Sequence, residues 1–166
     1  MVITGQEGVG KSTVVRALLR ALPGSAQIDA EDVGQVNPWT YDEAFRALHR
    51  RNVADLTRNF WQAGYGTVLA ASFVDTHPQL RDFLALLGGQ PELIVVQLCA
   101  SRSERDRRRT RRAKPTSRAA RHAADDAVPE DRTLAAHADE YDYLRVDTDG
   151  LSVERVVAVV LARIGR

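Results

Sequence analysis

The feature that most constrains this chain is the stretch from Gly5 to Ser12, which reads GQEGVGKS and fits the pattern G-x-x-x-x-G-K-[ST] at every specified position. It follows a short apolar segment, residues 1–4, and precedes a segment from about Ser12 to Leu22 with helical periodicity. Glycines at these positions let the backbone curl so that its N–H groups point inward, and the helix start adds partial positive charge. We therefore expect a phosphate-binding loop between a strand and a helix.

Each position of this loop has an expected role toward a nucleoside triphosphate. Lys11 is expected to bridge the β- and γ-phosphates and Ser12 to hold Mg²⁺, while Thr13 is a candidate for the α-phosphate. The loop therefore predicts that ATP and Mg²⁺ are the cofactors. The other predicted cofactor contacts come from Gly5, Glu7, Gly8, Val9 and Gly10.

Two other classes of nucleotide-binding protein are disfavoured by the rest of the sequence. A GTPase needs D-x-x-G after a middle strand and a later N-K-x-D, but DTDG occurs only at residues 147–150, near the end of the chain, and N-K-x-D is absent. A motor-type ATPase usually carries an acid at the end of an apolar strand, and the runs at 66–72 and 92–98 end without one. A different kind of nucleotide enzyme is indicated.

Apolar runs alternate with amphipathic segments along the chain. Runs typical of buried parallel strands occupy residues 1–4, 26–29, 66–72 and 92–98, with a weaker fifth at 143–147. Helical patterns occupy residues 41–64, the segment from Pro78 to the glycines that follow it, and the segment after Ser152, which is expected to be its cap. The alternation predicts an α/β fold, a three-layer α/β/α sandwich with a five-stranded parallel sheet and right-handed crossovers. At 166 residues the chain is expected to form one domain, residues 1–166.

The longest expected helix has a predicted inner and outer face. Phe45, Leu48, Leu56 and Phe60 are expected to face the core, and Arg46, Arg50, Asp55 and Arg58 to face solvent.

Three carboxylates follow the second expected strand. Asp29, Glu31 and Asp32 lie 18 to 21 positions after Lys11, where a doubly wound sheet brings its strand ends to one ligand-binding crevice. One of them is a candidate base for an attacking hydroxyl, and another a candidate to orient Mg²⁺ through water. Asp29 is the first choice for both roles. A purely structural role as turn or capping acids is the alternative.

Positive charge is concentrated in one segment. Residues 101–122 hold ten basic side chains and two acidic ones, whereas the rest of the chain holds 13 basic and 20 acidic. Ser101 and Glu104 form a capping box that predicts a helix start. Such a segment suits an anionic partner, although a solvated basic face is an open alternative. A nucleic-acid partner is disfavoured because the segment contains no aromatic residue for base stacking.

Together these features resemble the P-loop small-molecule kinases, a group that includes nucleoside-monophosphate, shikimate and gluconate kinases and chloramphenicol phosphotransferase. The resemblance spans the whole chain. Within the group, DAEDVG followed by Trp39, and later VVQLCASRSERDRRRTRRA, is similar to the ATP-binding tunicamycin-resistance proteins. The sequence departs from shikimate kinase, whose two acids after the second strand lie one residue apart.

The resemblance implies a nucleotide-kinase-like sheet with an Arg-rich lid at approximately 101–125. It places the base or Mg²⁺ orienter at Asp29, with Glu31 and Asp32 as helpers. Arginines of the lid would neutralise charge on the transferring phosphoryl group. Arg108 and Arg112, four residues apart and therefore on one helix face, fit the R-x-x-x-R spacing best, and Arg105 with Arg109 is a competing pair.

Other candidates lie where the substrates are expected. Ser72 and Asp75, with His77 beyond them, follow the third expected strand, although Asp75 or Thr76 also fits the cap of the next helix. Trp39, with Tyr41 beside it, offers a stacking wall for a ring-bearing acceptor, or else belongs to the core. By the resemblance, Asp147, Thr148 and Gly150 line the adenine pocket.

The sequence thus predicts an ATP-dependent kinase that moves the γ-phosphate of Mg-ATP to a hydroxyl of a small molecule such as a nucleoside, nucleotide, sugar acid or antibiotic. The predicted catalytic residues are Lys11, Asp29, Arg108 and Arg112, with Ser12 and Asp29 as metal ligands. An ATP-binding switch or resistance protein that phosphorylates no acceptor, and a polynucleotide 5'-kinase, are the alternatives.

A cytoplasmic location is expected, with no membrane partner, because Cys99 has no second cysteine to pair with and no apolar run is long enough to cross a bilayer. The sequence leaves open whether the protein is a monomer or a homodimer.

Overall fold

The computed structural model of the chain describes residues 1–34, 36–38, 40, 42–111 and 132–165. Five parallel strands form a sheet in the order β2-β3-β1-β4-β5. The strands are β1 (Val2–Thr4), β2 (Ser25–Asp29), β3 (Thr67–Ala71), β4 (Ile94–Cys99) and β5 (Asp142–Asp147). All carboxyl ends of the strands therefore meet at one edge of the sheet, where ligands of doubly wound folds bind.

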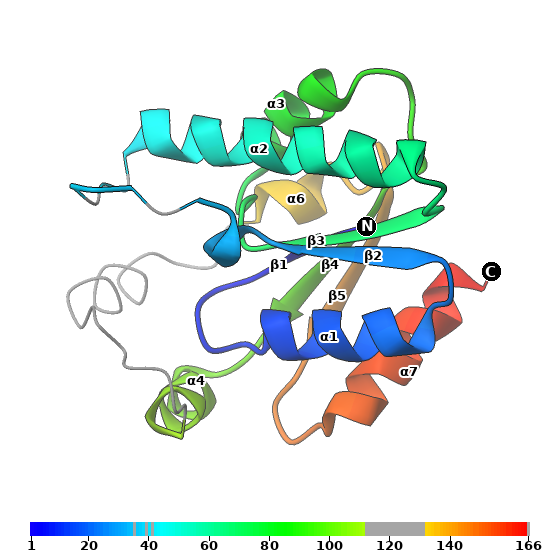
Figure 1. Cartoon of the computed structure of the whole chain (residues 1–166). Coiled ribbons are helices and arrows are strands. Elements are labelled where there is room, and N and C mark those ends of the chain that lie inside the picture. The colour runs from blue at the N-terminus through cyan, green and yellow to red at the C-terminus, as the bar shows by residue number, and fades with distance from the viewer. Residues whose placement is uncertain (35, 39, 41, 112–131, 166) are drawn as a thin grey trace.

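Helices cover both faces of this sheet, which confirms the predicted three-layer α/β/α sandwich. α1 (Lys11–Ala21) and α7 (Val153–Ile164) lie on one face. α2 (Glu43–Gln62), α3 (His77–Leu87) and the short α6 (Thr133–Ala136) lie on the other (Figure 1). The 3-10 turn η1 (Ala30–Asp32) follows β2, and α4 (Arg102–Thr110) lies beyond the carboxyl end of β4. In the described parts of the chain, no helix is both long and apolar enough to cross a membrane.

Burial on both faces explains why the three central strands β1, β3 and β4 read as nearly continuous apolar runs rather than as alternating patterns. Successive residues of β1 point to opposite cores: Val2 packs with Leu80 beneath α2 and α3, whereas Ile3 packs with Leu18 beneath α1 and α7. Ile3, Leu18 and Leu80 are fully buried, and each such side chain contributes about 2 kcal/mol by leaving water. Packing on both faces of the sheet therefore fixes the end of β1, from which the glycine-rich loop begins.

The helix starts agree with the predicted caps, and the structure resolves one open choice. Ser101, Ser152 and Thr76 each accept a hydrogen bond from the backbone N–H three residues ahead. Thr76 is therefore the cap of α3, and Asp75 is not. The Asp75 backbone N–H instead donates to Gln79 Oε1 at 2.8 Å.

The predicted faces of α2 were wrong at two positions. Leu48, expected inside, is 37% exposed, and Arg50, expected outside, is 3% exposed. Arg50 Nη2 donates to Glu43 Oε1 at 2.6 Å and to Asp82 Oδ2 of α3 at 3.4 Å. Both partners are carboxylates and both bond Nη2, so the buried guanidinium is ion-paired, whereas its Nη1 has no hydrogen-bond partner among the described residues.

Candidate active site

The loop after β1 depends on glycine at defined points. Gly5, Gly8 and Gly10 have φ values of 130°, 92° and 104°, all in the left-handed region. A Cβ on Gly5 would lie 2.2 Å from the carbonyl oxygen of Leu98, and one on Gly8 would lie 3.0 Å from Cβ of Arg105. The loop is thus pressed between β4 and α4. It ends at Gly10, the N-cap of α1, where no side chain caps the helix and the first N–H groups face the loop.

Three polar residues follow the loop and begin α1. Lys11 Nζ donates to the carbonyl oxygens of Gly5, at 2.5 Å, and Gln6, at 3.3 Å. Its ammonium is therefore held over the curled backbone whose N–H groups are expected to bind phosphate. Ser12 is half-buried and Thr13 is exposed. The Ser12 hydroxyl is a hard oxygen donor of the kind that Mg²⁺ prefers, so its chemistry fits the predicted ion.

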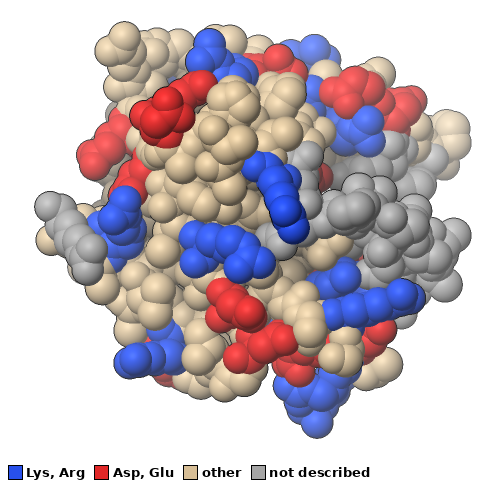
Figure 2. Space-filling model, turned by 180° about the vertical axis from the view of Figure 1, so that it is seen from behind, with Lys and Arg blue, Asp and Glu red and all other residues tan. Residues whose placement is uncertain are grey.

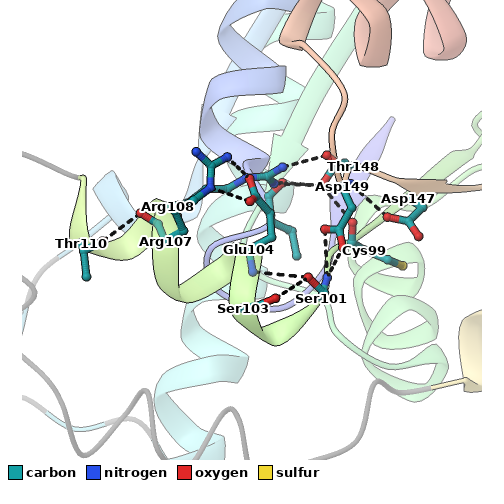
Figure 3. A network of polar contacts seen from close by, with 11 residues as sticks. Cys99, Ser101, Ser103, Glu104, Arg107, Arg108, Thr110, Asp147, Thr148 and Asp149 are labelled. Atoms are coloured by element: carbon teal, nitrogen blue, oxygen red, sulfur yellow. Dashed lines mark hydrogen bonds and ion pairs between the residues drawn. The ribbon is translucent and has the colours of Figure 1, made fainter.

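Arg108 connects the loop to two other segments, as Figure 3 shows in part. Its Nη1 donates to Val9 O and to Thr148 Oγ1, both at 2.9 Å, and its Nη2 donates to Thr148 O at 2.7 Å. Its Nε donates to Glu104 Oε1 at 2.7 Å. One guanidinium thereby joins the glycine-rich loop, α4 and the turn after β5.

The competing pair of arginines packs on the same loop. Arg105 and Arg109 are 4% and 7% exposed. Arg109 Nη2 donates to the Glu7 carbonyl oxygen at 3.2 Å, and its Nη1 bonds Asp106 Oδ1 at 2.9 Å. Both members of this pair are therefore buried in α4 next to the glycine-rich loop. Arg108 instead bonds the loop at Val9 O. Arg112 lies outside the described residues, as does the predicted lid beyond residue 111.

A cleft of about 200 Å³ opens between the start of α1, α4 and the start of α7. Val14, Leu151 and Val156 supply apolar wall, whereas Glu104, Arg108 and Thr148 supply polar groups. Apolar wall with a few placed polar groups suits a planar heterocycle next to a phosphate site. Thr148, which the resemblance assigns to the adenine pocket, lines this cleft. Leu151 and Val156 were not predicted, although apolar residues following a turn at the sheet edge are the signal that marks them.

The other residues of the predicted adenine loop have structural contacts. Asp147 Oδ1 accepts a hydrogen bond from the Asp149 N–H at 3.0 Å, and Gly150 supplies a φ of 68°. Asp149, which the sequence did not single out, accepts from the Ser101 N–H at 3.0 and 3.1 Å through its two carboxylate oxygens (Figure 3). The turn after β5 therefore fixes the start of α4.

Two carboxylates of α4, Glu104 and Asp106, offset part of the positive charge of its five arginines. Glu104 pairs with Arg107 at 2.5 Å and with Arg108 at 2.7 Å. The hydrogen bond from Arg107, followed by that from Arg108, lowers the pKa of Glu104 to about 2. Basic and acidic side chains are similarly interspersed on the face of the molecule in Figure 2. Arg107, Arg108 and Arg109 of this segment are therefore ion-paired within α4, and Arg105 and Arg109 are buried.

Asp29 ends β2 at the same edge of the sheet. It is 8% exposed, and its Oδ1 accepts from the Glu31 N–H at 3.3 Å as the cap of η1. Glu31 and Asp32, by contrast, are exposed. Since β3 separates β2 from β1, Asp29 lies two strand spacings from the strand that enters the loop, about 10 Å. That separation leaves room for a transferring phosphate and an acceptor hydroxyl.

Ser72 lies between these two positions, directly after β3. Its φ is 69°, in the left-handed region, and its buried Oγ has no hydrogen-bond partner among the described residues. An unpaired buried hydroxyl is costly, which makes Ser72 a candidate to bond a ligand. Asp75 is exposed. The segment between Ser72 and Asp75 is anchored to β1, because Thr4 Oγ1 donates to Val74 O at 2.5 Å. Trp39 and Tyr41 lie outside the described residues.

Comparisons with known proteins establish the fold. No protein-family model and no curated protein matches the chain. Among solved structures, the chain has the fold of the P-loop small-molecule kinases, as predicted. An unliganded sugar kinase from a Janibacter species has a TM-score of 0.78 at 15% identity, covering 99% of this chain and 92% of that one.

Two further structures show the same likeness. An APS kinase from Mycobacterium tuberculosis, in complex with AMPPNP and APS, has a TM-score of 0.67 at 17% identity, covering 99% of this chain and 96% of its own. The Deinococcus radiodurans tunicamycin resistance protein has a TM-score of 0.65 at 16% identity, covering 99% and 94%. At these identities the likeness establishes the shared architecture.

Proposed function

We propose that this protein is an ATP-dependent phosphotransferase that moves the γ-phosphate of Mg-ATP to a hydroxyl of a small molecule. The observation that carries the proposal is a convergence at one edge of the sheet. A loop with no room for a side chain at Gly5 or Gly8, a cleft suited to a base, and the buried carboxylate of Asp29 lie there together. A switch that only binds ATP would use Asp29 solely as the cap of η1, so the experiment below tests the carboxylate directly.

The nucleotide is held by groups whose positions are set before it binds. The backbone N–H groups of the loop and the ammonium of Lys11 hold the phosphates, and the base enters the cleft beside Arg108 and Thr148. Ser12, and Asp29 through water, would hold Mg²⁺, which would supply positive charge to offset that of the triphosphate. Because Arg108 and Arg109 already fix the loop, little reorganisation accompanies the reaction.

Transfer then requires an acceptor hydroxyl between Asp29 and the γ-phosphate. As the new O–P bond forms, the hydroxyl proton passes to the Asp29 carboxylate, and the β–γ bridging oxygen leaves with ADP. Burial of Asp29 limits competition from water at that position. Ser72 Oγ supplies a hydrogen bond that orients the acceptor. Arg112, as predicted from the sequence, stabilises the developing charge.

The acceptor class follows from a direct assay. ADP release is measured with Mg-ATP across nucleosides, nucleotides, APS, sugar acids, aminoglycosides, chloramphenicol, tunicamycin and an oligonucleotide with a free 5'-hydroxyl. We expect one small-molecule class to raise the rate, and Asp29→Asn to remove at least a hundredfold of that rate with nucleotide affinity kept. Asp32→Asn, whose carboxylate is exposed, is the matched control and keeps most of the activity.

Other outcomes would point to the alternatives. Slow hydrolysis that no acceptor stimulates and that Asp29→Asn leaves unchanged would indicate an ATP-dependent switch. Stimulation by the oligonucleotide alone would indicate a polynucleotide 5'-kinase.

A further inference from the structure

Three side chains with metal-binding atoms gather on the face of the sheet that α2 and α3 cover. His77 is the first residue of α3, His137 follows α6, and Glu140 lies two residues before β5. Their ligand atoms all lie within 4.8 Å of one another. The imidazole rings stack with centroids 3.7 Å apart, and His77 Nε2 lies 3.2 Å from Glu140 Oε2. The site proposed above uses none of these three groups.

A backbone carbonyl orients one of the rings. His137 Nδ1 lies 2.8 Å from the carbonyl oxygen of Thr133, and since a carbonyl only accepts, Nδ1 carries the proton and donates. The lone pair of this imidazole is then on Nε2. A histidine that donates Nδ1–H to a carbonyl while its other nitrogen binds a metal is a frequent arrangement in proteins.

The same threonine also holds the second histidine. Thr133 Oγ1 accepts from the His77 backbone N–H at 2.9 Å, which fixes the start of α3 next to α6. The His77 side chain is 13% exposed and that of Glu140 is 35% exposed, so the group is reachable from solvent. The hydrogen bonds to Thr133 therefore hold both histidines in place, and solvent ions can reach the three side chains.

We propose that His77, His137 and Glu140 form a binding site for a divalent transition metal of the zinc type. Two imidazole nitrogens and one carboxylate oxygen suit Zn²⁺, Co²⁺ or Ni²⁺ and disfavour Mg²⁺, which takes oxygen ligands. Three protein ligands leave a fourth position for water. When the ion binds, one imidazole ring rotates out of the stacked pair, so that one nitrogen of each ring points at the ion.

A competing cation sets the expected strength of the site. Arg81 Nη1 bonds Glu140 Oε2 at 3.0 Å, so the guanidinium occupies the carboxylate that the metal needs. Bound metal would join the start of α3 to the segment between α6 and β5. Those two segments are more than 60 residues apart in sequence, as the separation of 63 between His77 and Glu140 shows. This proposal does not depend on the proposed kinase activity.

Zn²⁺ titration of the whole chain in excess Mg²⁺, followed by calorimetry, tests the site. We expect saturable binding of one ion and a rise in the melting temperature. His77→Ala and His137→Ala should each weaken binding at least tenfold, whereas His49→Gln, on α2, should leave it unchanged. Co²⁺ should give the visible absorption of a nitrogen-ligated tetrahedral ion, lost in the same two variants.

Arg81→Ala separates a metal site from an ordinary ion pair. If the cluster binds metal, removal of the guanidinium frees Glu140 and tightens Zn²⁺ binding several-fold. Glu140→Gln, which keeps the size of the side chain, weakens it. The proposal is overturned if Zn²⁺ does not saturate one site, if binding survives the loss of both histidines, or if Arg81→Ala weakens binding.

Discussion

At the scale of single residues, the site is defined by positions where only one residue type fits. Gly5 combines a left-handed φ of 130° with a neighbour, Leu98 O, at 2.2 Å from any added Cβ. Arg108 uses three nitrogens to bond three different segments, which a lysine with its single nitrogen does not reproduce. The geometry of the loop at this scale is therefore set by close packing at Gly5 and by the direction of the Arg108 hydrogen bonds.

Gly5→Ala is expected to lower the free energy of unfolding by about 2 kcal/mol or more, because strain and a backbone clash add together. Gly24 is a matched control, since it has a φ of 70° but nothing within 4 Å of an added Cβ. Gly24→Ala should cost only about 1 kcal/mol, the strain alone. Urea unfolding of both variants compares the two, and equal losses would contradict the crowding of Gly5.

Arg108→Ala is expected to weaken nucleotide binding about tenfold or more, because the cleft loses the charged hydrogen bonds that hold Val9 and Thr148 in place. Arg102→Ala serves as the control. The Arg102 side chain is 72% exposed and its contact to Asp106 is 3.9 Å, so its loss should leave the affinity within about twofold. Titration with a fluorescent ATP analogue measures both variants, and an equal effect would show that only total charge matters.

At the scale of elements, α4 supports the glycine-rich loop that follows β1. Its Arg105 and Arg109 are buried against the loop, while Ser101 and Asp149 tie its start to the turn after β5. The basic composition of this helix therefore has a structural use as well as an electrostatic one. Two carboxylates on the same helix, Glu104 and Asp106, hold the neighbouring arginine side chains in place through ion pairs.

Glu104 gives this element a pH dependence with a definite sign. Its pKa falls from an ordinary value of 4.5 to about 2 in the folded chain, first through the hydrogen bond from Arg107. A lowered folded pKa means that the ionised group stabilises the fold above about pH 4.5, and that this contribution is lost as the pH falls toward 2. Glu104→Gln should therefore melt below the wild type at pH 7, and the difference should shrink as the pH is lowered through this range.

Thermal unfolding of the two proteins from pH 7 downward measures this difference. A gap between wild type and Glu104→Gln that stays constant, or widens in acid, would contradict the assigned role of the carboxylate. Asp55→Asn is a control, since Asp55 is paired only with Arg58 on the exposed side of α2 among the described contacts.

At the scale of the whole molecule, the sequence predicted the order of strands and helices along the chain well, because the central strands β1, β3 and β4 are nearly continuous apolar runs. β1 to β4 lie within about two residues of their predicted ranges. The glycine-rich loop and its context were also predicted in full. Local patterns of this kind follow from the chain's own periodicity, without knowledge of which segments meet.

Contacts between distant segments could not be predicted in this way. The burial of Arg50 depends on Asp82 of another helix, and the support of Ser101 depends on Asp149, 48 positions away. The cluster of His77, His137 and Glu140 likewise forms only when α3 and the segment before β5 meet. Because a polar residue reads as exposed until its partner is known, sequence periodicity misplaces these residues.

The central claim, that a phosphoryl group moves from ATP to a hydroxyl under the control of Asp29, is tested most directly by tracing the γ-phosphate itself. ATP labelled with ¹⁸O on the non-bridging γ-oxygens is incubated with Mg²⁺ and the best acceptor, and the products are analysed by mass spectrometry. We predict that all the labelled oxygens appear on the acceptor with the wild type and that this product is lost with Asp29→Asn. Label found only in inorganic phosphate, in the same amount for both proteins, would contradict the account.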